Sequence, residues 1–221
     1  MTMLEAARRQ MIDQQVRAWE VLDARVLETL ASVRREDFVP AEFRDVAFAD
    51  AAIPLGHGQH MLAPKVEGRI LQALELGRHE EVLEIGTGSG FFAACLARLA
   101  RRVRSIEIHP DLAAQAGTNL STAGIANVTV ETGDALALEF TGTDQGRYDS
   151  IAITASLPLY DERFQKALKI GGRMFVVVGK APVMEARLVT RTGPSDWSTE
   201  SLFETVIDPL VNAVEPPRFN F

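Results

Sequence analysis

The sequence predicts an α/β fold built on a mostly parallel sheet, and three observations support this. From Glu81 onward, apolar strand-like segments alternate with helical ones. The apolar run Val82–Ile85 stops at three alternate glycines, Gly86, Gly88 and Gly90, and an apolar helical segment follows at once. The 221 residues, 47% of them hydrophobic, suffice for one well-filled α/β domain. Strands in this order imply right-handed crossovers.

The residues before position 50 are predicted to be helical, because apolar side chains recur at helical separations. Asp23 is placed to cap a helix that runs to about Val33. The stretch Ala47–Pro64 is irregular and rich in proline and glycine, and loops of this length are often functional lids. Pro64 suits the first turn of a further helix. That helix carries its apolar side on Val66, Ile70, Leu71 and Leu74.

The core elements follow in sequence. Strands are predicted at Glu81–Ile85, Val103–Ile108, Val128–Thr132, Tyr148–Thr154 and Arg173–Val178. Helices are predicted at Ser89–Ala100, Asp111–Ala123 and Asp161–Leu168, the last ended by Gly171-Gly172. Two strand-like segments, Ala186–Thr192 and Leu202–Ile207, come without a long helix between them and predict an antiparallel C-terminal edge, with Gly193-Pro194-Ser195 as a hairpin turn.

The amino-acid composition limits the classes of partner and ligand that the protein is expected to have. The net charge of −7 and pI near 5.2 argue against a nucleic-acid partner, which needs a basic face. The single cysteine, Cys95, lies in an apolar helix and is expected to be packed; with four scattered histidines, no metal site is expected. Met1–Arg9 is polar and no apolar run reaches about 20 residues, so we expect a cytoplasmic protein without a membrane partner. The oligomeric state stays open.

The strand ends carry a set of candidate ligand contacts, since ligands of open parallel sheets lie beyond the carboxyl ends of the strands. A carboxylate at Glu107 can accept two ribose hydroxyls, and Asp134 can accept the exocyclic amine of adenine. An acidic residue at a strand end is, taken alone, more often a solvated loop residue. The candidates, in order along the chain, are Glu84, Gly86, Thr87, Gly88, Ser89, Gly90, Glu107, Gly133, Asp134, Ala135 and Thr154.

The details favour S-adenosylmethionine as the ligand. A dinucleotide fingerprint would have its third glycine where this chain has Phe91. Glu84, two positions before the first glycine, would repel a phosphate and suits a ligand with an ammonium and a sulfonium group. An NAD-dependent oxidoreductase is the weaker alternative.

From about Met11 to about Pro209 the chain resembles the protein-L-isoaspartate O-methyltransferases. The resemblance rests on Met11–Arg17, Arg25–Leu27, Asp37–Pro40, Pro54–Gln59, Leu83–Gly90 and Ile106–Ile108. It implies a class I enzyme with a Rossmann-like sheet, an N-terminal helical cap and a substrate-covering loop. In a single domain, residues 1–80 would form the cap and loop and residues 81–221 the core. The implied reaction is methylation of the isoaspartyl carboxylate, a step of protein repair.

One departure concerns the substrate loop. After Gly-Gln the family continues Thr-Ile-Ser, and its serine lies at the cofactor and the substrate carboxylate; this chain has His60-Met61-Leu62. The candidate catalytic residues are therefore Gln59, His60 and the serine position, Leu62. His60 or His57 could donate a hydrogen bond in place of the serine; alternatively, each faces solvent.

Methylation of a carboxylate requires few catalytic groups. A carboxylate is already the nucleophile at neutral pH, so no general base is needed, and the sequence reveals no acid–base pair. Two alternatives stay open. The apolar Leu62 could select an uncharged or small-molecule acceptor, or the chain could be a catalytically silent module that binds S-adenosylmethionine.

Overall fold

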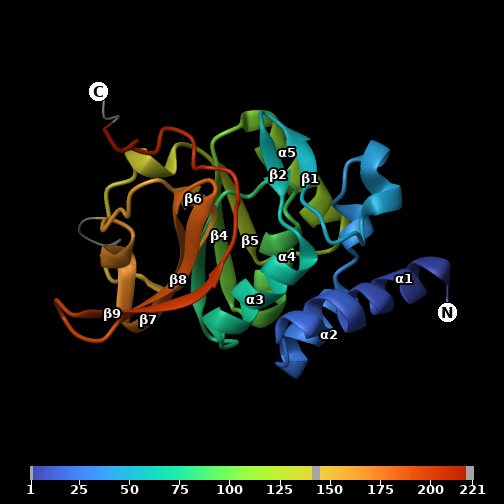
Figure 1. The fold of residues 1–221 in the computed structure, drawn as a ribbon, viewed down its shortest axis with the longest axis horizontal. Coiled ribbons are helices and arrows are strands. Elements are labelled where there is room, and N and C mark those ends of the chain that lie inside the picture. The colour runs from blue at the N-terminus through green and yellow to red at the C-terminus, as the bar shows by residue number, and fades with distance from the viewer. Residues whose placement is uncertain (1, 141–144, 218–221) are drawn as a thin grey trace.

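In the computed structural model, which describes residues 2–140 and 145–217, a seven-stranded sheet organises the chain (Figure 1). Its strands are β3 (Glu81–Ile85), β4 (Arg102–Glu107), β5 (Val128–Thr132), β6 (Tyr148–Leu157), β7 (Leu168–Lys180), β8 (Val183–Arg191) and β9 (Trp197–Glu204). Their spatial order is β5-β4-β3-β6-β7-β8-β9. The pairs from β5 to β7 are parallel, and β8 and β9 pair antiparallel. The predicted fold class is confirmed.

Strand positions follow the sequence prediction with differences at the ends. The ranges of β3 and β5 are those predicted, while β6 and β7 extend beyond theirs. The last strand lies earlier in the chain than predicted: β9 spans Trp197–Glu204, whereas the prediction was Leu202–Ile207. The predicted hairpin turn is confirmed: the N–H groups of Thr192 and Gly193 both donate to the carbonyl of Asp196, at 2.9 and 3.2 Å.

The predicted helix Asp161–Leu168 is wrong. Only a 3-10 turn, Gln165–Ala167, forms there, and Leu168 already belongs to β7. The two glycines that were expected to end a helix lie inside β7. A Cβ on Gly172 would lie 2.9 Å from the carbonyl oxygen of Asp149, so glycine allows the neighbouring backbone to approach closely.

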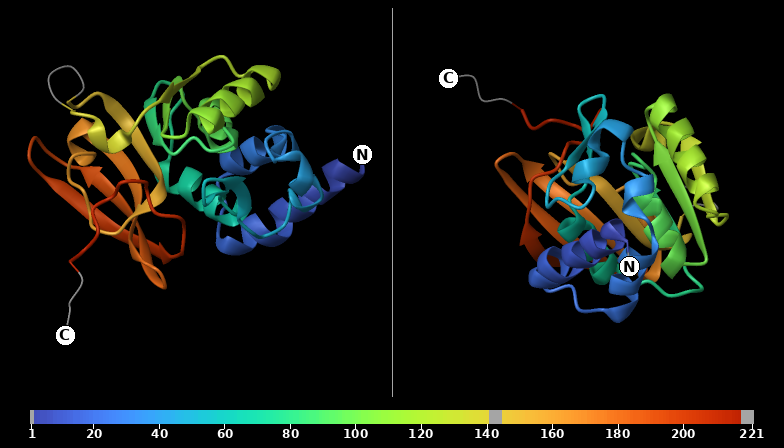
Figure 2. Two further views of the ribbon diagram at one scale, coloured as in Figure 1. Left: turned by 90° about the horizontal axis from the view of Figure 1, so that it is seen from above. Right: turned by 90° about the vertical axis from the view of Figure 1, so that its right-hand side faces the viewer.

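Helices cover one face of the sheet (Figure 2). They are α3 (Pro64–Leu74), α4 (Phe91–Leu99) and α5 (Pro110–Thr122), with α1 (Met3–Met11) and α2 (Ala24–Ser32) preceding them. The predicted cap is confirmed, since Asp23 accepts a 2.8 Å hydrogen bond from the N–H of Arg25. Cys95 is fully buried in α4, as expected. Residues 133–140 and 158–167, which form only loops and short 3-10 turns, cover the opposite face, where Leu83 and Phe164 pack.

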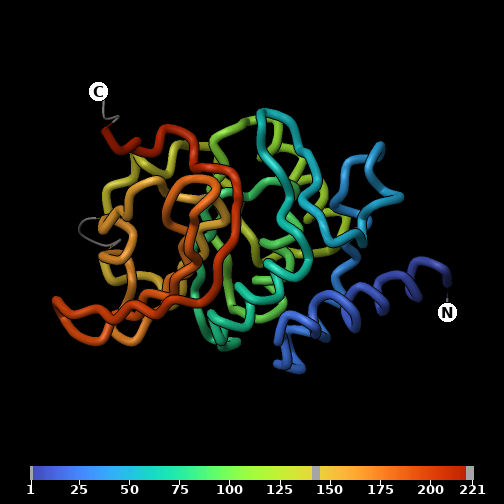
Figure 3. The backbone as a smooth tube through the Cα atoms, in the orientation of Figure 1, coloured from blue at the N-terminus to red at the C-terminus, as the bar shows by residue number. Residues whose placement is uncertain are grey.

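Two surface segments meet at the carboxyl ends of the strands. Within the predicted irregular stretch, β1 (Ile53–Gly56) and β2 (Gln59–Met61) form a hairpin, which we call the lid hairpin. After β9, residues 205–213 return across β6 as the C-terminal strap, where Ser156 N–H donates to Asp208 O and Leu210 N–H to Ser156 O, each at 2.8 Å. The chain trace shows the hairpin and the strap at the same end of the sheet (Figure 3).

Candidate active site

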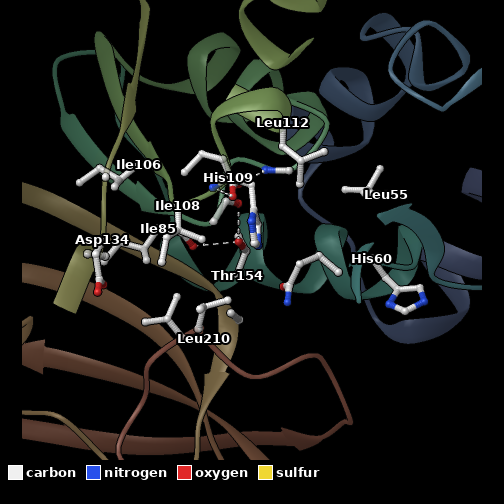
Figure 4. Close-up of a pocket in the computed structure, with 18 residues that line it drawn as sticks. Leu55, His60, Ile85, Ile106, Ile108, His109, Leu112, Asp134, Thr154 and Leu210 are labelled. Carbon is white, nitrogen blue, oxygen red and sulfur yellow. Dashed lines mark hydrogen bonds between the residues drawn. The ribbon is translucent and has the colours of Figure 1, made fainter. Parts of the chain in front are cut away.

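A pocket opens where the strand order reverses, since β3 pairs with β4 on one side and with β6 on the other. We call it the donor pocket. Figure 4 shows Leu55 and His60 at its lid side and Ile106 and Asp134 at the opposite side. Of the predicted cofactor contacts, its lining includes Gly86, Gly88, Glu107, Gly133, Asp134, Ala135 and Thr154.

The glycine turn presents bare backbone to this pocket. Gly86, Gly88 and Gly90 all have positive φ, at 95°, 52° and 85°. A Cβ on Gly86 would lie 2.6 Å from Thr154 Oγ1. That hydroxyl lies 2.9 Å from the carbonyl oxygen of Ile85 and 2.7 Å from that of Gly86, and its hydrogen is shared between them. The turn is therefore fixed against β6, and there is no room for a side chain at its first position.

Glu107 holds the turn from the other side. Its carboxylate is 5% exposed and accepts the N–H of Gly88 at 2.9 Å and that of His109 at 3.0 Å. Each oxygen keeps further lone pairs, and the residue lines the donor pocket. Contact with ribose hydroxyls is compatible with this placement and stays a prediction.

Asp134 ties the end of β5 to the C-terminal strap. One carboxylate oxygen accepts the N–H of Leu136 at 2.8 Å, and the other accepts the side-chain amide of Asn212 at 2.9 Å. Asn212 follows no motif, so nothing in the sequence alone singles it out. The predicted contact of Asp134 and Ala135 with adenine stays a prediction, with both residues in the pocket lining.

Glu84 lies beneath the glycine turn and is not among the residues that line the donor pocket. It is fully buried, accepts a hydrogen bond from Ser105, and Ser105 in turn lies 2.6 Å from the hydroxyl of Thr87. Burial raises the pKa of Glu84 from 4.5 to about 8, against the lowering effect of the Ser105 hydroxyl. At pH 7 the carboxyl group of Glu84 is mainly neutral and supports the turn. The geometry therefore does not favour the contact expected from the sequence, in which a charged Glu84 faces the ammonium and sulfonium groups of the ligand.

This raised pKa predicts a pH dependence of stability. Because the folded value exceeds the ordinary one, the contribution of Glu84 is complete below about pH 4.5 and is lost as pH rises through about 8. The free energy of unfolding of the wild type should therefore fall relative to that of Glu84→Gln across this window. Urea unfolding of both proteins at a series of pH values measures the difference. A difference that does not change with pH contradicts the assignment.

A wider groove of about 700 Å³ adjoins the donor pocket, and we call it the acceptor groove. The lid hairpin, the residues after β9 and the start of α3 form its walls. Gln59, His60 and Thr154 line both hollows. Leu62 is 9% exposed and lines the groove and a small cavity against the turn, which Thr87 and Ser89 also line. The three predicted catalytic positions are thus brought together.

An acid–base pair lies at this junction, although the sequence alone reveals none. His60 Nδ1 is 2.9 Å from a carboxylate oxygen of Asp208, 148 residues later in the chain. The two side chains are 39% and 30% exposed. The only sequence signal for Asp208 is an acidic residue inside the otherwise apolar run Val206–Leu210.

The tip of the lid hairpin is anchored by a second histidine. His57 Nε2 is 2.9 Å from Asp111, and its ring stacks on that of His109 with 4.1 Å between the ring centroids. His57 is therefore not simply a solvent-facing loop residue. His109 occupies the N-cap position of α5 without a capping hydrogen bond from its side chain, as expected for a residue at a helix entry, and it also lines the donor pocket.

A buried arginine fixes both ends of residues 47–62, which include the lid hairpin and which we call the lid segment. Arg35 has no exposed surface, and it donates to the carbonyl oxygens of Ala47 at 2.8 Å and Leu62 at 2.7 Å. It also forms an ion pair with Glu67, which is 1% exposed, and its guanidinium lies 4.9 Å from the ring centroid of Phe91. Burial raises the pKa of Glu67 to about 7, while Arg35 opposes this rise. In the sequence, Arg35 looks like part of a solvated charge run.

Comparison with known proteins agrees with this arrangement. The profile of the family described as protein-L-isoaspartate(D-aspartate) O-methyltransferase matches residues 6–215. A protein of that activity name from Magnetococcus marinus is 40% identical over 190 residues, covering 86% of this chain and 82% of its own. One from Myxococcus xanthus is 43% identical over 159 residues, covering 72% and 74%.

A solved structure gives the same fold. A β-aspartate methyltransferase from Plasmodium falciparum, in complex with S-adenosyl-L-homocysteine, superposes with a TM-score of 0.80 at 17% identity, covering 95% of this chain and 99% of its own. At that identity the likeness concerns the fold. The resemblance seen in the sequence and the cofactor of the family, S-adenosylmethionine, are both confirmed. The chain belongs to the protein-L-isoaspartate(D-aspartate) O-methyltransferase family.

Proposed function

We propose that this protein transfers a methyl group from S-adenosylmethionine to the free α-carboxylate of an isoaspartyl residue in a protein or peptide. One observation carries the proposal: in a chain of this family, the donor pocket and the acceptor groove meet at Gln59, His60 and Thr154. A narrow pocket with bare backbone suits the cofactor, and a wide groove suits a peptide.

The residues of the donor pocket fit the cofactor. At Gly86 and Gly88 a Cβ would fill the space against Thr154 and Leu55, so the backbone there is free to lie against the methionine part. Glu107 would hold the ribose, and Asp134 with the Ala135 N–H would hold adenine. Ile106, Leu112 and Leu210 supply the apolar walls that an adenine ring needs.

The chain's own residues supply alignment and exclusion of water. When bound, S-adenosylmethionine would supply a methyl group on a sulfonium. The acceptor carboxylate would form the new C–O bond as the C–S bond breaks, with S-adenosylhomocysteine as the leaving group, and no proton has to be removed. Leu55 and Leu62 place apolar surface over the glycine turn, which limits water at the reacting atoms. Holding the two reactants in line is then the main contribution of the protein.

The test is methylation of an isoaspartyl peptide beside its ordinary aspartyl counterpart. We expect an ester to form on the isoaspartyl peptide alone, and titration with S-adenosylhomocysteine serves as the control for an intact donor pocket. Equal methylation of both peptides, or of neither, with cofactor binding intact, overturns the isoaspartyl assignment and favours a different acceptor or a silent module.

Location and partners belong to the same proposal. No helix within residues 2–140 and 145–217 has the length and apolar character needed to cross a bilayer. We propose a cytoplasmic enzyme whose partner is a damaged protein. The net charge of −7 supports this over a nucleic-acid partner. We also propose that the chain acts as one domain, residues 1–80 serving as cap and loop and residues 81–221 as catalytic core.

A further inference from the structure

His60 lies where the hollows of the site meet. His60 and Thr154 line all three neighbouring hollows: the donor pocket, the acceptor groove and the small cavity between the lid hairpin and the glycine turn. A methyl group that passes from donor to acceptor crosses this place. The hydrogen of the Thr154 hydroxyl is already engaged by the carbonyl oxygens of Ile85 and Gly86. Of these two residues, His60 brings the available hydrogen-bonding group, and unlike the neutral amide of Gln59, which lines the donor pocket and the acceptor groove, its ring can carry a positive charge.

Asp208 determines which nitrogen of His60 is available. Its carboxylate lies 2.9 Å from Nδ1, so the proton of the ring is held on that atom. Among the described residues, Nε2 has no hydrogen-bond partner. Asp208 is itself held in place, because its carbonyl oxygen accepts the N–H of Ser156 at 2.8 Å. In the protonated ring, Nε2–H is the free donor.

The other cations near the groove are engaged. Lys65 Nζ lies 2.7 Å from Asp50 and 4.5 Å from the ring centroid of Trp19. Arg35 is buried and directs its N–H groups to two carbonyl oxygens and Glu67. The charged or titratable side chains that line these three hollows beside His60 are Asp50, Lys65, Glu67, Glu107, His109, Asp134, Glu204 and Asp208. An entering carboxylate therefore meets mostly negative charge unless His60 is cationic.

We propose that His60, oriented by Asp208, binds the acceptor carboxylate through Nε2–H and does so as the imidazolium. His60 is then a catalytic residue that touches the substrate, and Asp208 is a positioning residue. The inference rests on the proposed function and names the residue that recognises its acceptor. Because the carboxylate loses its charge during methyl transfer, the imidazolium holds the ground state at least as tightly as the transition state. Loss of His60 should therefore raise KM more than it lowers kcat.

The protonation of His60 gives the proposal a pH signature. Imidazole changes charge between about pH 5 and 8, while a carboxylate acceptor is ionised throughout this range. Acceptor affinity should therefore fall as pH rises. A general base would give the opposite sign, because it needs the neutral ring.

The experiment measures peptide binding and turnover on the same samples. A histidine-free isoaspartyl peptide, and its counterpart with a carboxamide in place of the carboxylate, are titrated into protein saturated with S-adenosylhomocysteine at about pH 5.5 and about pH 8. The variants are His60→Gln, which keeps a neutral donor, and Asp208→Asn. His79→Gln is the matched control, because His79 is exposed and lines neither hollow. Because His60 itself lines the donor pocket, urea unfolding and the far-UV circular dichroism spectrum verify that each variant is folded.

We expect the affinity of the wild type and of His79→Gln for the isoaspartyl peptide to be at least about 10-fold higher at the lower pH than at the higher pH. His60→Gln should bind weakly at both, Asp208→Asn should lose most of the pH dependence, and the carboxamide peptide should bind weakly to every protein. Unaltered peptide binding by His60→Gln overturns the inference. So does a rate of methylation that rises with pH in the wild type and does not rise in His60→Gln. Peptide that binds with the expected pH dependence and is not methylated refutes the proposed function alone; methylation that His60→Gln leaves intact refutes the inference alone. If the wild type neither binds nor methylates the peptide, both are refuted.

Discussion

Replacing Arg35 by methionine should destabilise the fold by about 3–5 kcal/mol. The substitution leaves Glu67 buried without its cation and removes the donors to the carbonyl oxygens of Ala47 and Leu62. Because both carbonyls belong to the lid segment, methyl transfer should fall as well. Urea unfolding gives the change in free energy, and S-adenosylhomocysteine titration shows how far the donor pocket survives.

Two further variants make this expectation specific to the buried pair. In Arg35→Met with Glu67→Leu, the uncompensated charge is gone, so a large part of the stability should return. Arg34→Met removes a neighbouring arginine whose side chain is 61% exposed, and it should cost little. If Arg35→Met and Arg34→Met are equally mild, the lid segment does not depend on Arg35.

Gly86→Ala should weaken S-adenosylhomocysteine binding by about 10- to 100-fold. The new Cβ would lie 2.6 Å from Thr154 Oγ1 at a backbone φ of 95°, so the turn must shift away from β6. That shift moves the N–H of Gly88 relative to Glu107, which would disturb the ribose contact as well. Isothermal titration measures the affinity.

Gly124→Ala separates backbone strain from local crowding. Gly124 has a φ of 68°, but a Cβ on it would meet no heavy atom within 4 Å, and the residue does not line the donor pocket. This variant should lose some stability and keep its cofactor affinity. Equal losses of affinity in both variants would mean that general destabilisation, not the shape of the turn, explains the Gly86→Ala result.

The donor side of the site could be predicted because its determinants are local. The carboxyl ends of parallel strands meet at one edge, so Gly86, Glu107 and Asp134 could be assigned to one pocket from strand order alone. What the pattern could not supply was the ionisation state of Glu84. Periodicity marks the residue as part of a strand, but only the packing shows that its carboxyl group lies beneath the turn.

The acceptor side depends on contacts between distant residues, and there the prediction was incomplete. The pair of His60 and Asp208 forms only after the C-terminal strap has crossed β6. Arg35 and Glu67 are 32 residues apart, and each looks solvated in its own sequence context. The wrong helix at Asp161–Leu168 has a similar cause, since pairing with β6 draws Leu168 into the sheet and overrides the local preference.

The C-terminal strap touches both sides of the reaction. Leu210 and Val211 line the donor pocket, Asp208 lines the acceptor groove, and Asn212 bonds to Asp134. One short stretch of chain therefore borders both hollows. If this stretch has to open before the spent cofactor can leave, the peptide site opens with it, and the rate of turnover would then follow the opening of the strap instead of the chemical step.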